Sequence, residues 1–261
     1  MAEPFFRFAE MVAPAVVALN GTKLKFEGLQ NIPVRGGALI ALNHTSYLDW
    51  MPASLAAHER GRRLRFMIKS EMADVKAVNY VIKHCQLIPV DRRMGHDAYA
   101  VAVQKLREGE LVGLHPEATI SRSYELRDFK SGTARMALQA RVPIIPLIVW
   151  GAHRIWPKDH PKKVFRNKVP ITVAAGRPLP PHGDTEQLIA ALRRVMNELL
   201  CRVQEEYPHP EGESWVPRRL GGSAPTQDDS RAIRLAELQE RVQRSGSDGV
   251  TRPGRTQSGL H

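Results

Sequence analysis

A histidine and an aspartate stand five residues apart in the segment NHTSYLD, residues 43–49. An imidazole with a pKa near ~6.5 can remove a proton from an alcohol at neutral pH. A carboxylate on its second ring nitrogen fixes the tautomer and stabilises the imidazolium that forms. We therefore predict that His44 is a general base and that Asp49 orients it. A cap at a strand or helix end is the alternative role for His44, and this segment alone leaves both open.

The elements around this segment place the two side chains together. The apolar run Ala38–Leu42 predicts a buried strand that ends just before the histidine. Asp49 should then lie about one turn into a following helix, folded back toward the imidazole. The sequence predicts seven strands in all: Leu24–Glu27, Ala38–Leu42, Leu64–Ile68, Leu87–Val90, Leu111–Leu114, Ile144–Trp150 and Ile171–Ala175.

Helical patterns alternate with these strands. Tyr99, Ala102, Val103 and Leu106 have the spacing of one buried helical face. Another helix is predicted from Gly132 to Gln139, and the clearest begins near Asp184, which can form a capping box with Gln187. This alternation indicates an α/β fold: a single domain with a central, largely parallel mixed sheet flanked by helices.

Three further segments follow the His-x4-Asp pair of His44 and Asp49. They are LIPVDR at 87–92, HPEAT at 115–119 and VPIIPL at 142–147. In this order the four segments resemble the four blocks of the glycerolipid acyltransferase family, of the 1-acylglycerol-3-phosphate acyltransferase type. The third block of that family reads Phe-Pro-Glu-Gly-Thr. The resemblance runs from about residue 25 to about residue 180.

The third block departs from the family pattern at two positions. Ala118 replaces the usual glycine, and Ile120 stands where an arginine is common, with Arg122 following. Alanine adopts a positive φ less readily than glycine, so this loop is where we expect altered geometry. The resemblance still implies the family's activity, with the substrate detail open.

The resemblance implies transfer of a fatty acyl group from an acyl thioester, acyl-CoA or acyl carrier protein, to the free hydroxyl of 1-acylglycerol-3-phosphate. Another lysophospholipid or a glycolipid acceptor stays open because the third block is altered. A hydrolase that uses His44 to activate water is a further alternative. However, the chain lacks a Gly-x-Ser-x-Gly elbow and a His-Glu-x-x-His site. No metal and no organic cofactor are implied.

An acceptor phosphate requires positive charge near the histidine. Arg92 and its neighbour Arg93 qualify because a guanidinium holds two phosphate oxygens at once. Glu117 matches the glutamate that the family associates with acceptor binding, and we expect it to bind a glycerol hydroxyl or to brace an arginine. The resemblance and these charges give the predicted substrate-binding residues as Arg92, Glu117, Thr119, Arg122 and Lys130.

The composition limits the classes of partner that the chain can bind. The chain has 261 residues and a net charge of +11, and its last 54 residues carry eight Arg and seven acidic residues, or +1. The remaining +10 suits nucleic acid, anionic lipid or phosphorylated small molecules. We predict no nucleic-acid binding, because no basic run is interleaved with stacking aromatics. Cys85 and Cys201 form no CxxC pair, which fits a reducing cytoplasm.

The ends of the chain differ from its middle. No stretch reaches the ~18 apolar residues that span a bilayer. Residues 1–22 mix aromatics with charges, which predicts an amphipathic helix lying at the membrane interface; a helix packed on the domain is the alternative. Residues 23–207 then form the acyltransferase domain, and 208–261 a mobile, mostly disordered tail with one helix from Asp229 to Arg244. We expect a peripheral protein on the cytoplasmic face of the membrane.

Overall fold

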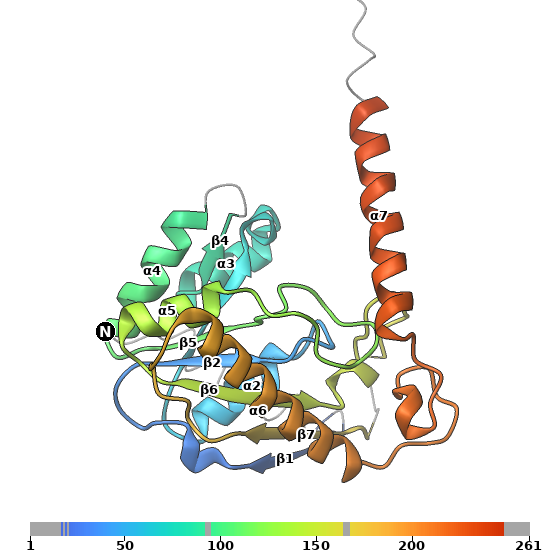
Figure 1. The fold of residues 1–261 in the computed structure, drawn as a ribbon, viewed down its shortest axis with the longest axis horizontal. Coiled ribbons are helices and arrows are strands. Elements are labelled where there is room, and N and C mark those ends of the chain that lie inside the picture. Colours follow the sequence, from blue (N-terminus) through green and yellow to red (C-terminus); the bar gives the residue numbers. More distant parts are fainter. Residues whose placement is uncertain (1–16, 18, 20, 92–94, 164–167, 248–261) are drawn as a thin grey trace, which may run out of the picture.

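One seven-stranded sheet with helices on both faces organises the chain (Figure 1). The computed structural model describes residues 17, 19, 21–91, 95–163 and 168–247. The helix predicted within residues 1–22 lies almost wholly outside these described residues, and so do Arg92 and Arg93.

All seven predicted strands are present, with ends shifted by at most one residue. Each strand is a run of apolar or alternating residues, and this pattern is why the strand could be predicted from the sequence. The strands are β1 (Lys23–Glu27), β2 (Ala38–Leu42), β3 (Leu64–Lys69), β4 (Ile88–Val90), β5 (Leu111–Leu114), β6 (Ile144–Trp150) and β7 (Pro170–Ala175).

The sheet is mixed but largely parallel, as predicted. Its order is β1-β7-β6-β2-β5-β3-β4, and among these neighbours only β6 and β7 pair antiparallel. Strand β2 lies between β5 and β6, parallel to both. Because parallel strands end at the same edge, the residues after β2 and β5 must lie close together, which is where open α/β sheets bind ligands.

Two apolar layers hold the helices against the sheet. Leu39 and Ala41 of β2 face the layer formed with α4 (Gly95–Arg107), α5 (Gly132–Ala140) and α6 (Thr185–Glu205). Ala38, Ile40 and Leu42 face the opposite layer, which includes α2 (Trp50–His58). Successive side chains of a strand point to opposite faces, so a strand covered on both faces must be apolar throughout.

The predicted helices are also present. The stripe from Tyr99 to Leu106 lies in α4, and the segment from Gly132 forms α5. Asp184 and Gln187 form the predicted capping box at the start of α6. Helix α3 (Lys76–His84) follows β3 through a short 3₁₀ turn at Ser70–Asp74.

The described part of the C-terminal segment packs on the domain before it projects away. Val216 and Ala224 are fully buried, and the Trp215 ring lies 5.4 Å from the ring of His153. Helix α7 (Gln227–Ser247) contains the helix predicted from Asp229 to Arg244 and extends outward from the sheet (Figure 1). Thr226 and Asp229 start it with reciprocal hydrogen bonds. Residues 248–261 lie outside the described residues.

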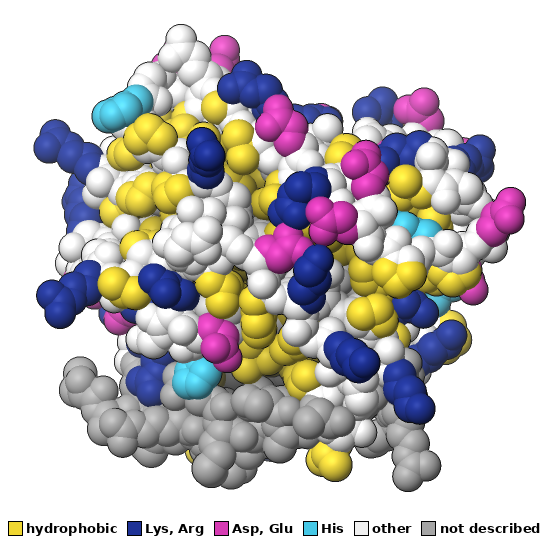
Figure 2. All heavy atoms as spheres, turned by 90° about the horizontal axis from the view of Figure 1, so that it is seen from below, with side chains coloured by type: hydrophobic (Ala, Val, Ile, Leu, Met, Phe, Trp, Pro, Cys, Tyr) yellow, Lys and Arg dark blue, Asp and Glu magenta, His cyan; other side chains and the backbone are white. Residues whose placement is uncertain are grey.

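The surface carries charges of both signs. Figure 2 shows lysine and arginine side chains distributed over one face, with acidic and apolar side chains among them. None of the helices in the described part of the chain has both the length and the apolarity that a bilayer span requires.

Candidate active site

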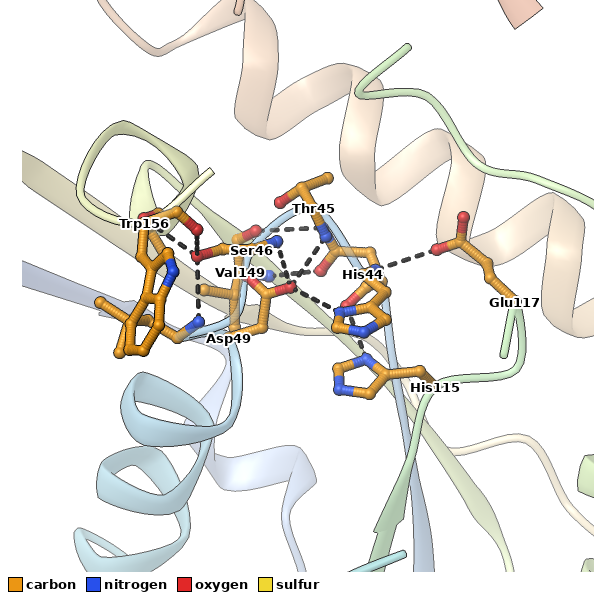
Figure 3. Close-up of polar contacts among 11 residues, drawn as sticks. His44, Thr45, Ser46, Asp49, His115, Glu117, Val149 and Trp156 are labelled. Carbon is orange, nitrogen blue, oxygen red and sulfur yellow. Dashed lines mark hydrogen bonds and ion pairs between the residues drawn. The ribbon is translucent and has the colours of Figure 1, made fainter. Parts of the chain in front are cut away.

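His44 and His115 meet at the carboxyl edge of the sheet (Figure 3). His44 follows β2 and His115 directly follows β5, its parallel neighbour. Their rings stack, with centroids 3.8 Å apart and planes inclined by 15°. The topology therefore brings together two blocks that are 71 positions apart in the sequence (115 − 44).

Asp49 contacts the imidazole of His44, as the sequence predicts, but its position relative to the following helix differs from the prediction. It precedes α2 as its N-cap residue, so it does not lie one turn into that helix. Its fully buried carboxylate folds back, and Oδ2 accepts the N–H groups of Thr45 and Ser46 at 2.8 Å each. The same oxygen lies 3.1 Å from His44 Nδ1 (Figure 3).

The loop after β5 fixes the backbone of His44 on both sides. The His44 N–H donates to Glu117 Oε1 at 2.9 Å, and its carbonyl oxygen accepts the N–H of Ser121 at 2.7 Å. Glu117 Oε2 also accepts the backbone N–H of Arg127 at 3.0 Å. Glu117 thus joins the first and third blocks through main-chain contacts, which is a positioning role; its predicted role in binding the acceptor stays a prediction.

Asn43 anchors the other flank of the histidine. Its buried amide donates to the carbonyl oxygen of Val149 on β6 at 3.0 Å and accepts the Val149 N–H at 2.7 Å. This side chain continues the β2–β6 pairing one residue beyond the strand. Ser46 ties the same segment to the loop after β6 through the carbonyl oxygens of Ala152 and Trp156. The histidine therefore stands on backbone held by two neighbouring strands.

Burial sets the protonation of the pair. It lowers the pKa of His44 well below the usual range, and the charges of Lys69 and Lys158 lower it further. Burial raises the pKa of Asp49, but the backbone N–H groups of Thr45 and Ser46 point at Oδ2, so this oxygen acts as an acceptor without a proton. Nδ1 then carries the ring proton, and Nε2 keeps the lone pair that a base requires.

The predicted substrate-binding residues have different environments. Thr119 is half-buried in the loop after β5, while Lys130 is exposed just before α5. Arg122 is buried between two carboxylates, Asp159 at 2.5 Å and Glu237 of α7. Ala118, which replaces the family's glycine, has a φ of +56°, so the loop keeps a left-handed residue at this position despite the substitution.

A cavity of about 290 Å³ opens beside the histidine loop. Its lining combines the cations Arg122 and Lys158 with the carboxylates of Asp159 and Glu237, and it includes Thr45, the residue after His44. Sequence reasoning missed Lys158 because it lies in an irregular loop after β6 with no motif around it. It also missed the pairing of His115 with His44, although a histidine at the end of an apolar strand was a usable signal.

Comparisons with known proteins agree with this architecture. A family model described as acyltransferase matches residues 23–150. The chain is 23% identical over 206 residues to the 1-acyl-sn-glycerol-3-phosphate acyltransferase of Bacillus subtilis, which covers 77% of this chain and 98% of that protein. It is 28% identical over 144 residues to the protein of the same name from Borreliella burgdorferi, covering 54% of this chain and 56% of that protein.

A solved structure has the same fold. The crystal structure of the 1-acyl-sn-glycerophosphate (LPA) acyltransferase PlsC from Thermotoga maritima superposes with a TM-score of 0.60 at 20% identity. The match covers 78% of this chain and 84% of that chain.

Proposed function

Because the chain belongs to the glycerolipid acyltransferase family, we propose that it acylates the free hydroxyl of 1-acylglycerol-3-phosphate to give phosphatidic acid. The observation that carries this proposal is the imidazole of His44, held by the buried carboxylate of Asp49 at the carboxyl edge of the sheet. The acyl donor is a thioester, either acyl-CoA or acyl carrier protein. No metal or organic cofactor takes part.

In the proposed reaction, His44 removes the hydroxyl proton as the acceptor oxygen attacks the thioester carbonyl. The C–O bond forms, the C–S bond breaks, and the proton returns to the thiolate that leaves. Asp49 stabilises the imidazolium between these steps because it already accepts the Nδ1–H. The thioester is activated, so both substrates can react directly, without an acyl-enzyme.

Positive charge near His44 supports an anionic acceptor. Lys69 and Lys158 are close enough to lower the pKa of the imidazole, and Lys158 lines the cavity with Arg122. Arg122 is paired with Asp159 and Glu237, and Lys158 lies 4.0 Å from Glu237, so an acceptor phosphate in this cavity competes with these carboxylates for the cations. We propose Lys158 and Arg92 as the principal phosphate ligands, with Arg122 and Lys130 as further cations.

The surroundings of the site also support action at a membrane surface. Tyr47, Trp50 and Trp156 expose about half, half and a third of their surface. The rings of Tyr47 and Trp156 lie 5.6 Å apart, and Lys162 Nζ lies 4.7 Å from the Trp156 ring centre. Aromatic rings with lysines suit the headgroup region of a bilayer. The protein would bind peripherally, on the cytoplasmic face, with residues 1–22 contributing.

Replacement of His44 tests the catalytic proposal. His44→Ala should reduce the acylation rate at least ~100-fold, the range of a lost general base, because it removes the imidazole that takes the hydroxyl proton. Diacyl product is measured from purified protein, an acyl thioester and a panel of lysolipids. The exposed His182→Ala serves as the matched control. Unchanged turnover in His44→Ala would remove the mechanism, and a preference for another lysolipid would change the acceptor.

Charge removal tests the phosphate ligands. Lys158→Ala and Arg92→Ala should each raise the acceptor KM several-fold, roughly the loss of one charge-assisted contact, while the donor KM changes little. Lys23→Ala, on the far edge strand, is the control. A larger rise in the donor KM would assign these cations to the thioester substrate.

Sedimentation with anionic vesicles tests the membrane proposal. Binding should weaken with added salt, because headgroup attraction is screened. It should also weaken on deletion of residues 1–20 and in the double variant Trp50→Ala/Trp156→Ala. Val101→Ala removes a comparably exposed apolar side chain from α4 and should have no effect. If neither the deletion nor the double variant weakens vesicle binding, the membrane contact lies elsewhere on the protein.

A further inference from the structure

Of the three neighbouring side chains His44, Asp49 and His115, the proposed reaction does not use His115. Its ring stacks on that of His44, and its Nδ1 lies 3.0 Å from the carbonyl oxygen of Asn43. A carbonyl can only accept, so Nδ1 donates its proton there and Nε2 keeps a lone pair. The family block has phenylalanine at this position, so the second imidazole is a departure of this chain.

The three side chains together have the composition of a metal site. One ligand atom from each of His44, Asp49 and His115 lies within 4.8 Å of the others. Asp49 Oδ1 is buried and, within the described part of the protein, has no hydrogen-bond partner. Such a carboxylate oxygen, beside two neutral imidazoles, is a favourable ligand for a cation. Burying a charged oxygen without a partner costs free energy, and a bound cation would supply the missing partner.

We propose that His44, Asp49 and His115 bind a transition-metal ion of the Zn²⁺ class, and that this binding inhibits acyl transfer. Two imidazoles and one carboxylate are the donor set that Zn²⁺ accepts, leaving a fourth position open. Zn–N bonds of ~2.0–2.1 Å put tetrahedral ligand atoms roughly 3.3 Å apart, so the three ligand atoms must move closer together. The two rings must also turn out of their stacked, nearly parallel arrangement, so that a lone pair of each points at the same ion. The His44 side chain is 20% exposed, so an ion can reach it.

The ion is an inhibitor because it uses the atoms that the reaction needs. A metal bound between Asp49 and His44 takes the lone pair of Nδ1, so the Nδ1 proton moves to Nε2 or to solvent as the ion binds. With Nδ1 on the metal and the proton on Nε2, the imidazole has no free lone pair to accept the hydroxyl proton. The thioester needs no Lewis acid for attack, so the ion offers no compensating advantage. The inhibitory part of the proposal rests on the proposed function, whereas metal binding does not.

Calorimetric titration of the full-length protein with Zn²⁺ tests the site. The wild type should bind one ion per chain, and His115→Phe should weaken binding at least ~10-fold. Loss of an outer-shell partner alone costs ~10–100-fold in metal affinity, and His115 is a proposed direct ligand. His115→Gln, which can still donate to the Asn43 carbonyl, serves as a second variant if the phenylalanine disturbs folding. His84→Phe, another histidine stacked on an aromatic ring, should leave Zn²⁺ binding unchanged.

Rates with added Zn²⁺ test the consequence. Zn²⁺ should inhibit the wild type reversibly, with recovery on chelation, and each variant is scored against its own metal-free rate. The inhibitory concentration should rise at least ~10-fold in His115→Phe, while Mg²⁺, a hard ion with oxygen ligands, should not inhibit. Equal Zn²⁺ affinity in the wild type and both His115 variants would overturn the proposal. If one ion binds through His115 but no acyl transfer occurs, the site stands and the proposed function falls.

Discussion

A buried carboxylate oxygen that accepts two backbone N–H groups and faces an imidazole nitrogen is the constraint on which the site depends. Asp49 Oδ2 closes the turn after β2 by accepting from Thr45 and Ser46, and it faces the Nδ1 of His44. Its proton-free state is fixed by those donors, and this in turn fixes the tautomer of the imidazole. The same interaction therefore shapes the loop, orients the ring and determines which nitrogen can act as a base.

The sheet supplies the rigid frame for this interaction. Strand β2 lies between β5 and β6, and each neighbour holds one flank of the histidine: Glu117 and Ser121 after β5 bind its backbone, and Val149 of β6 binds Asn43. A base placed on such a central strand end is positioned by main-chain hydrogen bonds, which tolerate little displacement. The first and third blocks of this chain are thus far apart in the sequence but close in space, because they follow adjacent parallel strands, β2 and β5.

Local patterns made part of this architecture predictable. The seven strands could be predicted because each is a short run of apolar or alternating residues. The His44–Asp49 contact could be predicted because five residues suffice for a turn. Long-range pairings were not readable. The contact between Arg122 and Glu237 depends on where the C-terminal segment packs, which its Pro- and Gly-rich composition conceals. Lys158 lies near the histidine only because an irregular loop folds over the sheet edge.

The state of the His44 ring is the most direct test of the account. Nitrogen NMR of the labelled protein reports which ring nitrogen carries the proton and whether the ring gains a second one. We expect a proton on Nδ1, a bare Nε2, and no protonation as the pH falls through ~6.5, because burial and two lysines lower the pKa of this imidazole. Replacing Asp49 with asparagine should disturb this tautomer. A proton on Nε2, or titration of His44 near ~6.5, would contradict the role assigned to Asp49 and to burial.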